Sequence, residues 1–300
     1  MFVEAIKRVG AFTRPIHIIT RLYKQSEVLP GAASMFFVNE NGYAVTCKHV
    51  AEIIVNATMG ITQQNYNRFR GESHKYLKDS HNTYHIQRLE QQFNLELGTI
   101  VTQKVNFINS FSNLSQIDVT YHPKYDLALL HFQSEGPYFY THYAEFLADN
   151  QEYEVGRSLC RLGFPFSEFK NFRYNANIDD IEWTPDAPHV TPAFPIDGIL
   201  TRFIGDETGY PYALEMSTPG LVGQSGGPLF DKHGIIYGMQ QSTRHLHLGF
   251  DMINQDVWIG THRAKVSNHP FLHVGVCISA EIIKDFLRHQ KVKFYQRRPE

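Results

Sequence analysis

Short hydrophobic runs separated by tight turns recur in both halves of this 300-residue chain, and they limit the folds open to it. In the first half, residues 39–42 end in Asn-Gly and lie between the β-prone runs 34–38 and 43–46, a pattern that predicts a hairpin. In the second half, the turn 231–234 follows the short run 228–230 in a similar way. Two halves built of short strands predict two sandwich or barrel modules around one cleft.

Two segments depart from this β pattern. Residues 62–96 are polar with apolar residues at helical spacing, so we expect a helical insertion at about residues 55–98. Near the end of the chain, Ser279 is a candidate N-cap and an apolar stripe follows it, which predicts a closing helix over about 280–290.

The composition excludes several classes of protein. Hydrophobic residues make up 42% of the chain and charged residues 19%, which is typical of a globular rather than a disordered protein. The net charge of −2 provides no positive field for nucleic acid or anionic lipid, and we expect neither as a partner. No apolar run is long enough for a membrane helix or a signal peptide, so we expect a soluble, cytoplasmic protein without membrane contact.

The cysteines support the same expectation. The chain has three, Cys47, Cys160 and Cys277, an odd number spread widely, which argues against a disulfide framework. Cys47 is interpreted as a small thiol of the core.

The segment that carries chemistry is GQSGGP at residues 223–228. A serine between glycines, just before a strand, can be held on a tight turn with its Oγ exposed and with backbone N–H groups facing one point. A nucleophilic Ser225 needs a base and an acid that orients the base. His49 and Asp126 each lie at the edge of an apolar run, where catalytic groups are found on a β scaffold. A tight turn without catalysis is the alternative interpretation.

With His49, Asp126 and Ser225 in this order, the chain resembles the trypsin/chymotrypsin superfamily, and within it the bacterial Deg-type branch. The matching segments are the glycine-led hairpin 31–38, the histidine motif 46–50, the opening of the second barrel at 162–165 and the last strand at 274–279. The resemblance covers about residues 30–290 apart from the insertion, and no PDZ-like segment follows the closing helix.

The resemblance implies an all-β, chymotrypsin-like fold with two six-stranded antiparallel β-barrels. The first barrel would span about residues 17–140 and carry the helical insertion, and the second would span about 151–280, followed by the C-terminal helix. The whole chain, 1–300, would form a single trypsin-like peptidase domain.

The resemblance also implies a serine endopeptidase. Ser225 would attack the scissile carbonyl, His49 would take and return the proton, and Asp126 would orient the imidazole. The N–H groups of Gly223 and Ser225 would form the oxyanion hole. No cofactor or metal is implied, and the partner is a protein or peptide substrate.

The resemblance places the substrate at two strand segments and one loop. Pro219 and Gly220 would form the pocket floor, residues 241–243 (Gln241, Ser242 and Thr243) would pair with the substrate backbone, and Val274 and Gly275 would form a wall. None of these residues is acidic, so we expect a small or medium uncharged residue before the cut bond. An acid from the segment 244–270, Asp251 or Asp256, would change that preference.

Two other functions remain open from the sequence. The cleft would grip peptides without cutting them if the triad were misaligned, or it would act as an esterase-like hydrolase with the same triad. The helical insertion would dock a regulatory partner, cap the cleft or only decorate the barrel. His245 and His247 have a spacing that suits a metal, but without a third ligand they are interpreted as surface histidines.

Overall fold

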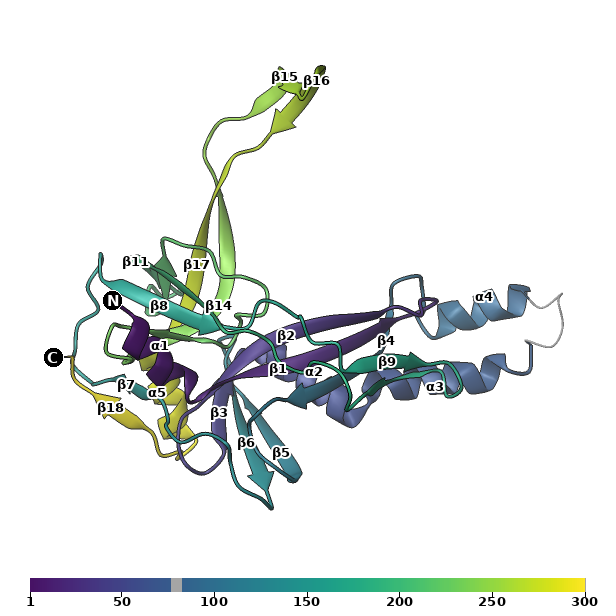
Figure 1. Cartoon of the computed structure of the whole chain (residues 1–300), viewed down its shortest axis with the longest axis horizontal. Helices are drawn as coiled ribbons and strands as arrows, with labels where there is room; N and C mark the ends of the chain where they lie inside the picture. Colours follow the sequence, from purple (N-terminus) through teal and green to yellow (C-terminus); the bar gives the residue numbers. More distant parts are fainter. Residues whose placement is uncertain (77–82, 300) are drawn as a thin grey trace.

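The computed structural model of the chain describes residues 1–76 and 83–299. Residues 77–82, part of the predicted insertion, and residue 300 lie outside the described residues. The described residues form two groups of mainly antiparallel strands with helices at their edges (Figure 1).

The first group is a six-stranded antiparallel sheet in the order β4-β1-β2-β3-β6-β5. Its strands are β1 (Thr13–Leu22), β2 (Val28–Phe37), β3 (Tyr43–Thr46), β4 (Ile100–Phe107), β5 (Leu114–Tyr121) and β6 (Ala128–Ser134). The predicted hairpin is confirmed, because β2 and β3 pair with Phe36 opposite Val45. Gly42 has a φ of +80° in the turn between them, a conformation that a side chain disfavours.

The second group closes on itself. Six of its strands form a ring in the order β13-β8-β11-β12-β17-β14, because β13 pairs with both β8 and β14. Two further strands extend this sheet in parallel: β7 pairs with β14, and β18 pairs with β7. The strands are β7 (Glu145–Leu147), β8 (Ser158–Gly163), β11 (Phe194–Gly205), β12 (Pro211–Met216), β13 (Pro228–Phe230), β14 (Ile236–His247), β17 (Phe271–Ser279) and β18 (Tyr295–Arg297). The all-β, two-barrel chymotrypsin-like architecture predicted from the sequence is confirmed.

The helices agree with the sequence in part. They are α1 (Val3–Gly10), α2 (Lys48–Met59), α3 (Ile61–Ser73), α4 (Thr83–Gln92) and α5 (Ala280–His289). The insertion is helical as expected, although its first helix begins at Lys48. The closing helix is confirmed, with the Ser279 Oγ accepting a hydrogen bond from the Ile282 N–H. Helix α1 was not predicted, since its first turn lacks a side-chain cap. Within the described ranges, no helix has the length and apolar character needed to cross a membrane.

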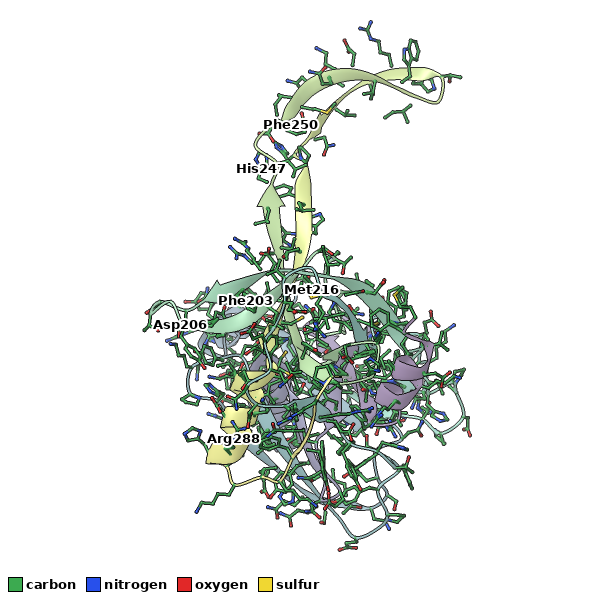
Figure 2. The ribbon with its side chains drawn as sticks, turned by 90° about the vertical axis from the view of Figure 1, so that its left-hand side faces the viewer. Phe203, Asp206, Met216, His247, Phe250 and Arg288 are labelled. Atoms are coloured by element: carbon green, nitrogen blue, oxygen red, sulfur yellow. The ribbon has the colours of Figure 1, made fainter. Side chains whose placement is uncertain are left out.

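Two strands of the second barrel continue far beyond it. Strands β14 and β17 stay paired as far as His247 opposite Phe271, and β15 (Met252–Ile259) and β16 (His262–Asn268) form a hairpin at their end. We call residues 244–273 the arm. Figures 1 and 2 show the arm projecting away from the body, with His247 and Phe250 on it. The sequence indicated only an insert of unspecified structure here, and the structure shows it to be a two-stranded ribbon.

One hydrophobic core joins the two barrels. Phe36 and Leu130 of the first sheet belong to the same buried cluster as Met239 and Ile278 of the second and Phe286 of α5. A second cluster lies inside the second barrel, around Tyr237, and a small hairpin of β9 (Phe172–Asn175) and β10 (Asp180–Trp183) packs beside β1. Because the core is shared, the two barrels are packed against each other.

Candidate active site

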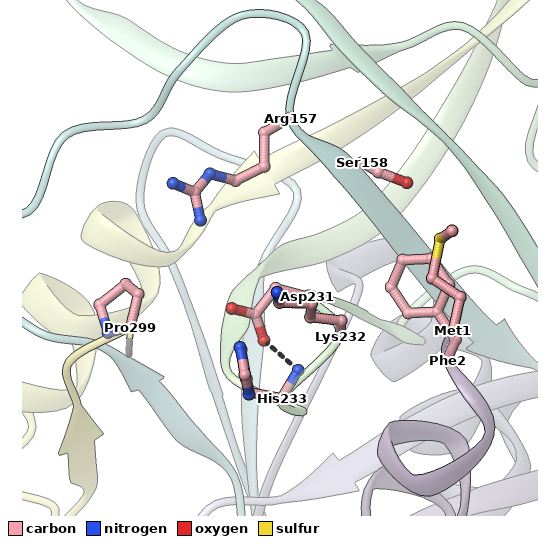
Figure 3. A pocket seen from close by; sticks show the side chains of 8 residues that line it. All are labelled: Met1, Phe2, Arg157, Ser158, Asp231, Lys232, His233 and Pro299. Atoms are coloured by element: carbon pink, nitrogen blue, oxygen red, sulfur yellow. Dashed lines mark hydrogen bonds between the residues drawn. The ribbon is translucent and has the colours of Figure 1, made fainter.

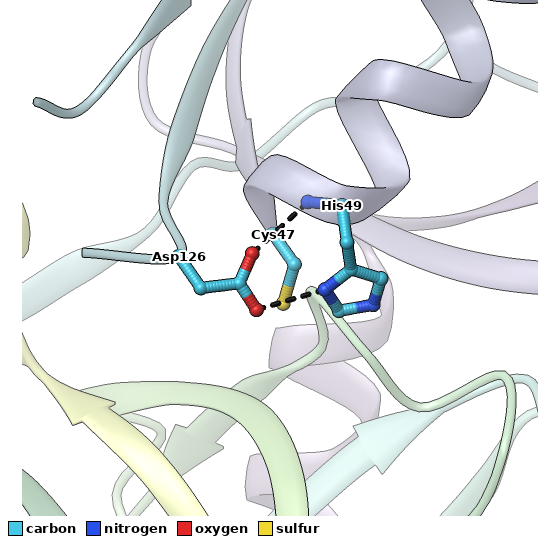
Figure 4. Close-up of side chains that lie close together, drawn as sticks. All are labelled: Cys47, His49 and Asp126. Atoms are coloured by element: carbon cyan, nitrogen blue, oxygen red, sulfur yellow. Dashed lines mark hydrogen bonds and ion pairs between the residues drawn. The ribbon is translucent and has the colours of Figure 1, made fainter. Parts of the chain in front are cut away.

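His49 and Asp126 are held together by two hydrogen bonds (Figure 4). His49 lies in the first turn of α2, and Asp126 lies in the turn before β6. The His49 backbone N–H donates to Asp126 Oδ1 at 3.0 Å, and His49 Nδ1 lies 2.8 Å from Asp126 Oδ2. Burial opposes ionisation of this carboxyl, but the His49 hydrogen bonds outweigh it and lower the pKa of Asp126. The carboxylate therefore fixes the imidazole orientation and leaves Nε2 as the ring nitrogen available for proton transfer.

Ser225 lies on a turn that is fixed to the first barrel. The Ser34 Oγ donates to the Gly223 carbonyl at 2.8 Å, and the Ser34 N–H donates to the Ser225 carbonyl at 2.9 Å. Gly223 and Gly226 have φ values of +94° and +85°, which explains why glycine occupies both positions. The buried Gln224 side chain fastens the turn from the inside by hydrogen bonds to the backbone of the second barrel.

The same turn leaves two backbone donors free. Its carbonyls at Gly223 and Ser225 are engaged by Ser34, so they point away from the side on which a substrate would lie. Within the described part of the chain, the N–H groups of Gly223 and Ser225 donate to no protein acceptor. Two N–H groups of one turn without partners are the elements of an oxyanion hole.

The segments that carry His49 and Ser225 meet at Gln240 of β14. The Gly226 N–H donates to the Gln240 carbonyl at 2.9 Å, and the Cys47 thiol donates to the same oxygen at 3.3 Å. Ser225 Oγ itself donates to the Gln241 carbonyl at 3.3 Å. Among the described residues no hydrogen bond joins Ser225 to His49, a looseness common in sites without substrate.

A pocket of about 370 Å³ opens beside Ser225. Its lining includes five of the predicted substrate-binding residues, Pro219, Gly220, Gln241, Ser242 and Thr243, and also Leu221, Val222, Gln240, His245 and His273.

Val274 and Gly275 do not line this pocket. Val274 is only 3% exposed, and the side of Gly275 where a Cβ would stand is filled by the Arg161 guanidinium. The wall that the resemblance placed at these two residues is supplied one position earlier in β17, by His273.

The sequence reasoning missed the two histidines of the pocket. His245 follows Thr243 at a spacing of two, and alternate residues of a strand share one face, so the strand pattern contained the signal for His245. His273 enters the pocket because β17 places it directly opposite His245, a pairing that a sequence alone does not reveal.

Cys47, His49 and Asp126 bring three potential metal ligands close together (Figure 4). Metals bind the thiolate form of cysteine, however, and burial raises the pKa of the Cys47 thiol, with Asp126 adding to the effect. The thiol also donates to a carbonyl. These observations favour a buried structural cysteine over a metal ligand.

A second group of ligands lies on the arm. His247 Nε2 and His269 Nδ1 lie 2.7 and 2.8 Å from Asp251 Oδ1. The Gly249 N–H donates to Nδ1 of His247, so Nδ1 is an acceptor. The hydrogen of the neutral imidazole therefore lies on Nε2, the atom that faces Asp251. A metal at Nε2 would require the opposite tautomer. The group is therefore interpreted as a hydrogen-bond cluster in which Asp251 joins His247 and His269 of the arm.

A separate pocket of about 330 Å³ lies between the two chain ends, near Phe2 and Pro299 (Figure 3). Its carboxylate, Asp231, accepts hydrogen bonds from the backbone N–H groups of His233 and Ile235. Asp231 thus fixes the β13–β14 turn, and this pocket shares no lining residue with the one beside Ser225.

Comparison with known proteins adds one finding. The family model of the trypsin-like peptidase domain matches residues 33–239, more than half of the chain, and this range contains His49, Asp126 and Ser225. No curated protein matches the chain.

Proposed function

The chain belongs to the trypsin-like peptidase family, and from this premise we propose that it is a serine endopeptidase that works through Ser225, His49 and Asp126. The observation that supports this most directly is the doubly hydrogen-bonded His49–Asp126 pair beside a turn that presents Ser225 and two free N–H groups.

In this proposal Ser225 Oγ attacks the scissile carbonyl and its proton passes to His49 Nε2. The carbonyl oxygen becomes an oxyanion that accepts hydrogen bonds from the N–H groups of Gly223 and Ser225. His49 then gives the proton to the leaving amine, which departs and leaves an acyl-enzyme on Ser225. Water, activated by the same imidazole, releases the acid product and restores the serine. Asp126 stays ionised and stabilises the imidazolium, in keeping with its lowered pKa.

The free edge of β14 supports a mode of substrate binding. Ser242 and Thr243 of this strand pair with β17 on one side, while β13 and β7 end their pairing with β14 earlier. An extended substrate can add a strand there, which places its backbone beside Ser225 and its side chain in the pocket.

One observation favours a second candidate, a peptide-binding module without turnover. The Ser225 hydroxyl donates to the Gln241 carbonyl instead of to His49. If that arrangement persisted with substrate bound, the cleft would hold peptides but not cut them. An esterase-like hydrolase would use the same nucleophile and is separated from the peptidase only by its substrate.

The test is covalent labelling of Ser225 with a fluorophosphonate probe, together with cleavage of casein and of a matched ester. Labelling and casein cleavage, both lost in Ser225→Ala, are expected. Labelling with ester hydrolysis alone indicates the esterase. Absence of labelling in a folded protein that still binds peptides indicates the binding module and overturns the proposal.

We also propose that residues 1–300 form a single peptidase domain, since one buried cluster joins both barrels, α1 and α5.

Three free buried thiols are in keeping with a reducing, cytoplasmic setting. The helices α3 and α4 extend from the body opposite the termini (Figure 1), which suits the docking of a regulatory partner.

A further inference from the structure

The pocket beside Ser225 is lined by side chains that can donate hydrogen bonds and by no acidic side chain. None of its lining residues, all of them in the described part of the chain, is aspartate or glutamate. The two acids considered from the sequence are engaged elsewhere on the arm: Asp251 contacts His247 and His269, and Asp256 pairs with Arg263.

Two exposed histidines form the outer wall of this pocket. His245 and His273 are direct neighbours across β14 and β17, and their Nδ1 atoms lie 2.6 Å apart. At that distance one Nδ1 donates a proton to the other. The ring that accepts this hydrogen bond carries its own hydrogen on Nε2. The pair therefore offers a ring N–H donor, which suits a carboxylate.

A permanent positive charge lies behind the inner wall. Arg161 of β8 is fully buried, and its guanidinium donates to Gln240 Oε1 at 2.8 Å and to the Thr218 carbonyl at 2.9 Å. Its Nε has no partner, and no ion pair joins it to a carboxylate in the part of the chain described. A buried charge without a counter-charge is costly, so an anion nearby would be stabilised by it.

The Gln240 side chain links this charge to the pocket. Gln240 lines the pocket, accepts from Arg161 through Oε1 and donates to the Ser242 carbonyl through Nε2. Two glycines make room for the arrangement, because a Cβ at Gly220 would collide with the Gln240 amide and one at Gly275 with the guanidinium. The two glycines and Gln240 thus allow the Arg161 guanidinium to lie close to the pocket floor.

A polar ligand also suits the remaining wall. Gln241 lies at the bulge of β14, and its buried amide oxygen has no hydrogen-bond partner. Gln241 also lines the pocket, and the NH₂ of its side-chain amide is a donor suited to an acceptor there. An apolar side chain would leave it unpaired.

We propose that this pocket selects an acidic side chain, glutamate or aspartate, on the N-terminal side of the cut bond. His245 and His273 contact its carboxylate, and Arg161 attracts it through Gln240. This inference rests on the proposed function, and it replaces the small or medium uncharged residue expected from the sequence. The difference arises because neither histidine nor the buried arginine was placed at the pocket by sequence motifs.

The test compares peptides that are identical except for the residue before the cut bond. Glutamate and glutamine differ in charge but hardly in shape, so their ratio of kcat/KM isolates the effect of charge. We expect glutamate to exceed glutamine by about tenfold or more, with lysine the poorest. A ratio of one or below, or preferred cleavage after leucine or lysine, overturns the inference.

Substitution of the two exposed histidines assigns the preference to residues. His245→Gln with His273→Gln should lower the glutamate-to-glutamine ratio several-fold, while His262→Gln, on the distal part of the arm, should leave it unchanged. If the double variant keeps the parent glutamate-to-glutamine ratio, the proposed role of the histidine pair is overturned. Arg161→Met is the complementary variant, but this residue is buried and its replacement can cause misfolding. The inference is therefore judged by the double variant of the exposed His245 and His273.

Binding to Ser225→Ala protein separates this inference from the proposed function. Calorimetry with the same peptides needs no turnover, and tighter binding of the glutamate peptide supports the pocket assignment. Equal affinity for both peptides overturns it. Failure of Ser225 labelling in the parent protein, by contrast, overturns the proposed function and leaves the binding comparison valid.

Discussion

The two halves of the site are held to different degrees. In the first half, His49 and Asp126 are joined by hydrogen bonds from both backbone and side chain, in contact with a shared core. In the second half, the Ser225 hydroxyl faces the Gln241 carbonyl, and the amide oxygen of Gln241 in the pocket beside it has no hydrogen-bond partner. The His49–Asp126 pair is thus preorganised. The groups that contact the substrate gain their hydrogen-bond partners only when the substrate binds.

Removing either half of the proposed triad should have the largest effect. Ser225→Ala or His49→Ala is expected to lower kcat/KM by about 10⁵ to 10⁶, because neither half acts without the other. The residual rate comes from the free N–H groups of the turn. Peptide hydrolysis measures the loss, and an unchanged thermal unfolding curve is the control for folding. Cleavage at the parent rate by either variant would show that the halves do not act together.

The preorganised half can be weakened without removing the base. Asp126→Asn should lower kcat by about 10⁴, because an amide cannot accept hydrogen bonds from both His49 groups and favours the wrong tautomer. Asp256→Asn, in an exposed ion pair of the arm, is the matched control and should change kcat little. Equal behaviour of the two variants would mean that the His49–Asp126 contact plays no catalytic part.

The junction between the halves depends on a glycine. A Cβ at Gly226 would collide with the Ser34 carbonyl and the Thr46 hydroxyl, and its φ of +85° adds strain. Gly226→Ala should therefore destabilise the protein by about 3 to 4 kcal/mol. Gly249→Ala, with a φ of +88° but open space around it, should cost only about 1 kcal/mol. Urea unfolding compares the two, and similar losses would show that the turn is not tightly docked.

A buried histidine reports on the contact between the first sheet and the chain before β11. His17 of β1 is fully buried, its Nε2 lies 2.7 Å from Thr191 Oγ1, and its ring stacks on Phe169. Burial, with a smaller effect from His189, lowers the pKa of His17 to about 4.

Because this value lies below that of an unfolded histidine, the unfolded chain binds the proton more tightly. Stability should be full above about pH 6.5 and should fall by about 2 to 3 kcal/mol as the pH drops to about 4. His17→Gln removes the titrating group, so its free energy of unfolding should change less over that window. Parallel curves for the two proteins would contradict the assignment.

Local signals in the sequence predicted the parts of the fold that local signals determine. The Asn-Gly turn defines the first hairpin, and Ser279 with the stripe after it defines α5. The same logic placed His49, Asp126 and Ser225 at edges that the structure brings near one another. Helix α1 was missed because no capping side chain precedes it.

The pocket was harder to predict because its character depends on partners distant in sequence. Arg161 is an ordinary residue of an apolar run until Gln240 of β14, Gly275 of β17 and Thr218 surround its guanidinium. His273 acquires its role only through pairing with His245. A sequence contains the residues of such a site but not the register that assembles them.

The arm provides the sharpest contrast with the body, and removal of its distal part, residues 249–269, should have the smallest effect. Its large apolar side chains remain exposed, with Trp258 at 73%, and two strands alone are marginally stable in water. The Leu248 N–H donates to the Pro270 carbonyl at 3.0 Å, so Asn-Gly in place of residues 249–269 can close a short hairpin there. The free energy of unfolding should change by less than about 0.5 kcal/mol, and short-peptide hydrolysis by less than about twofold. A larger loss in either measurement would show that the arm supports the barrel from which it extends.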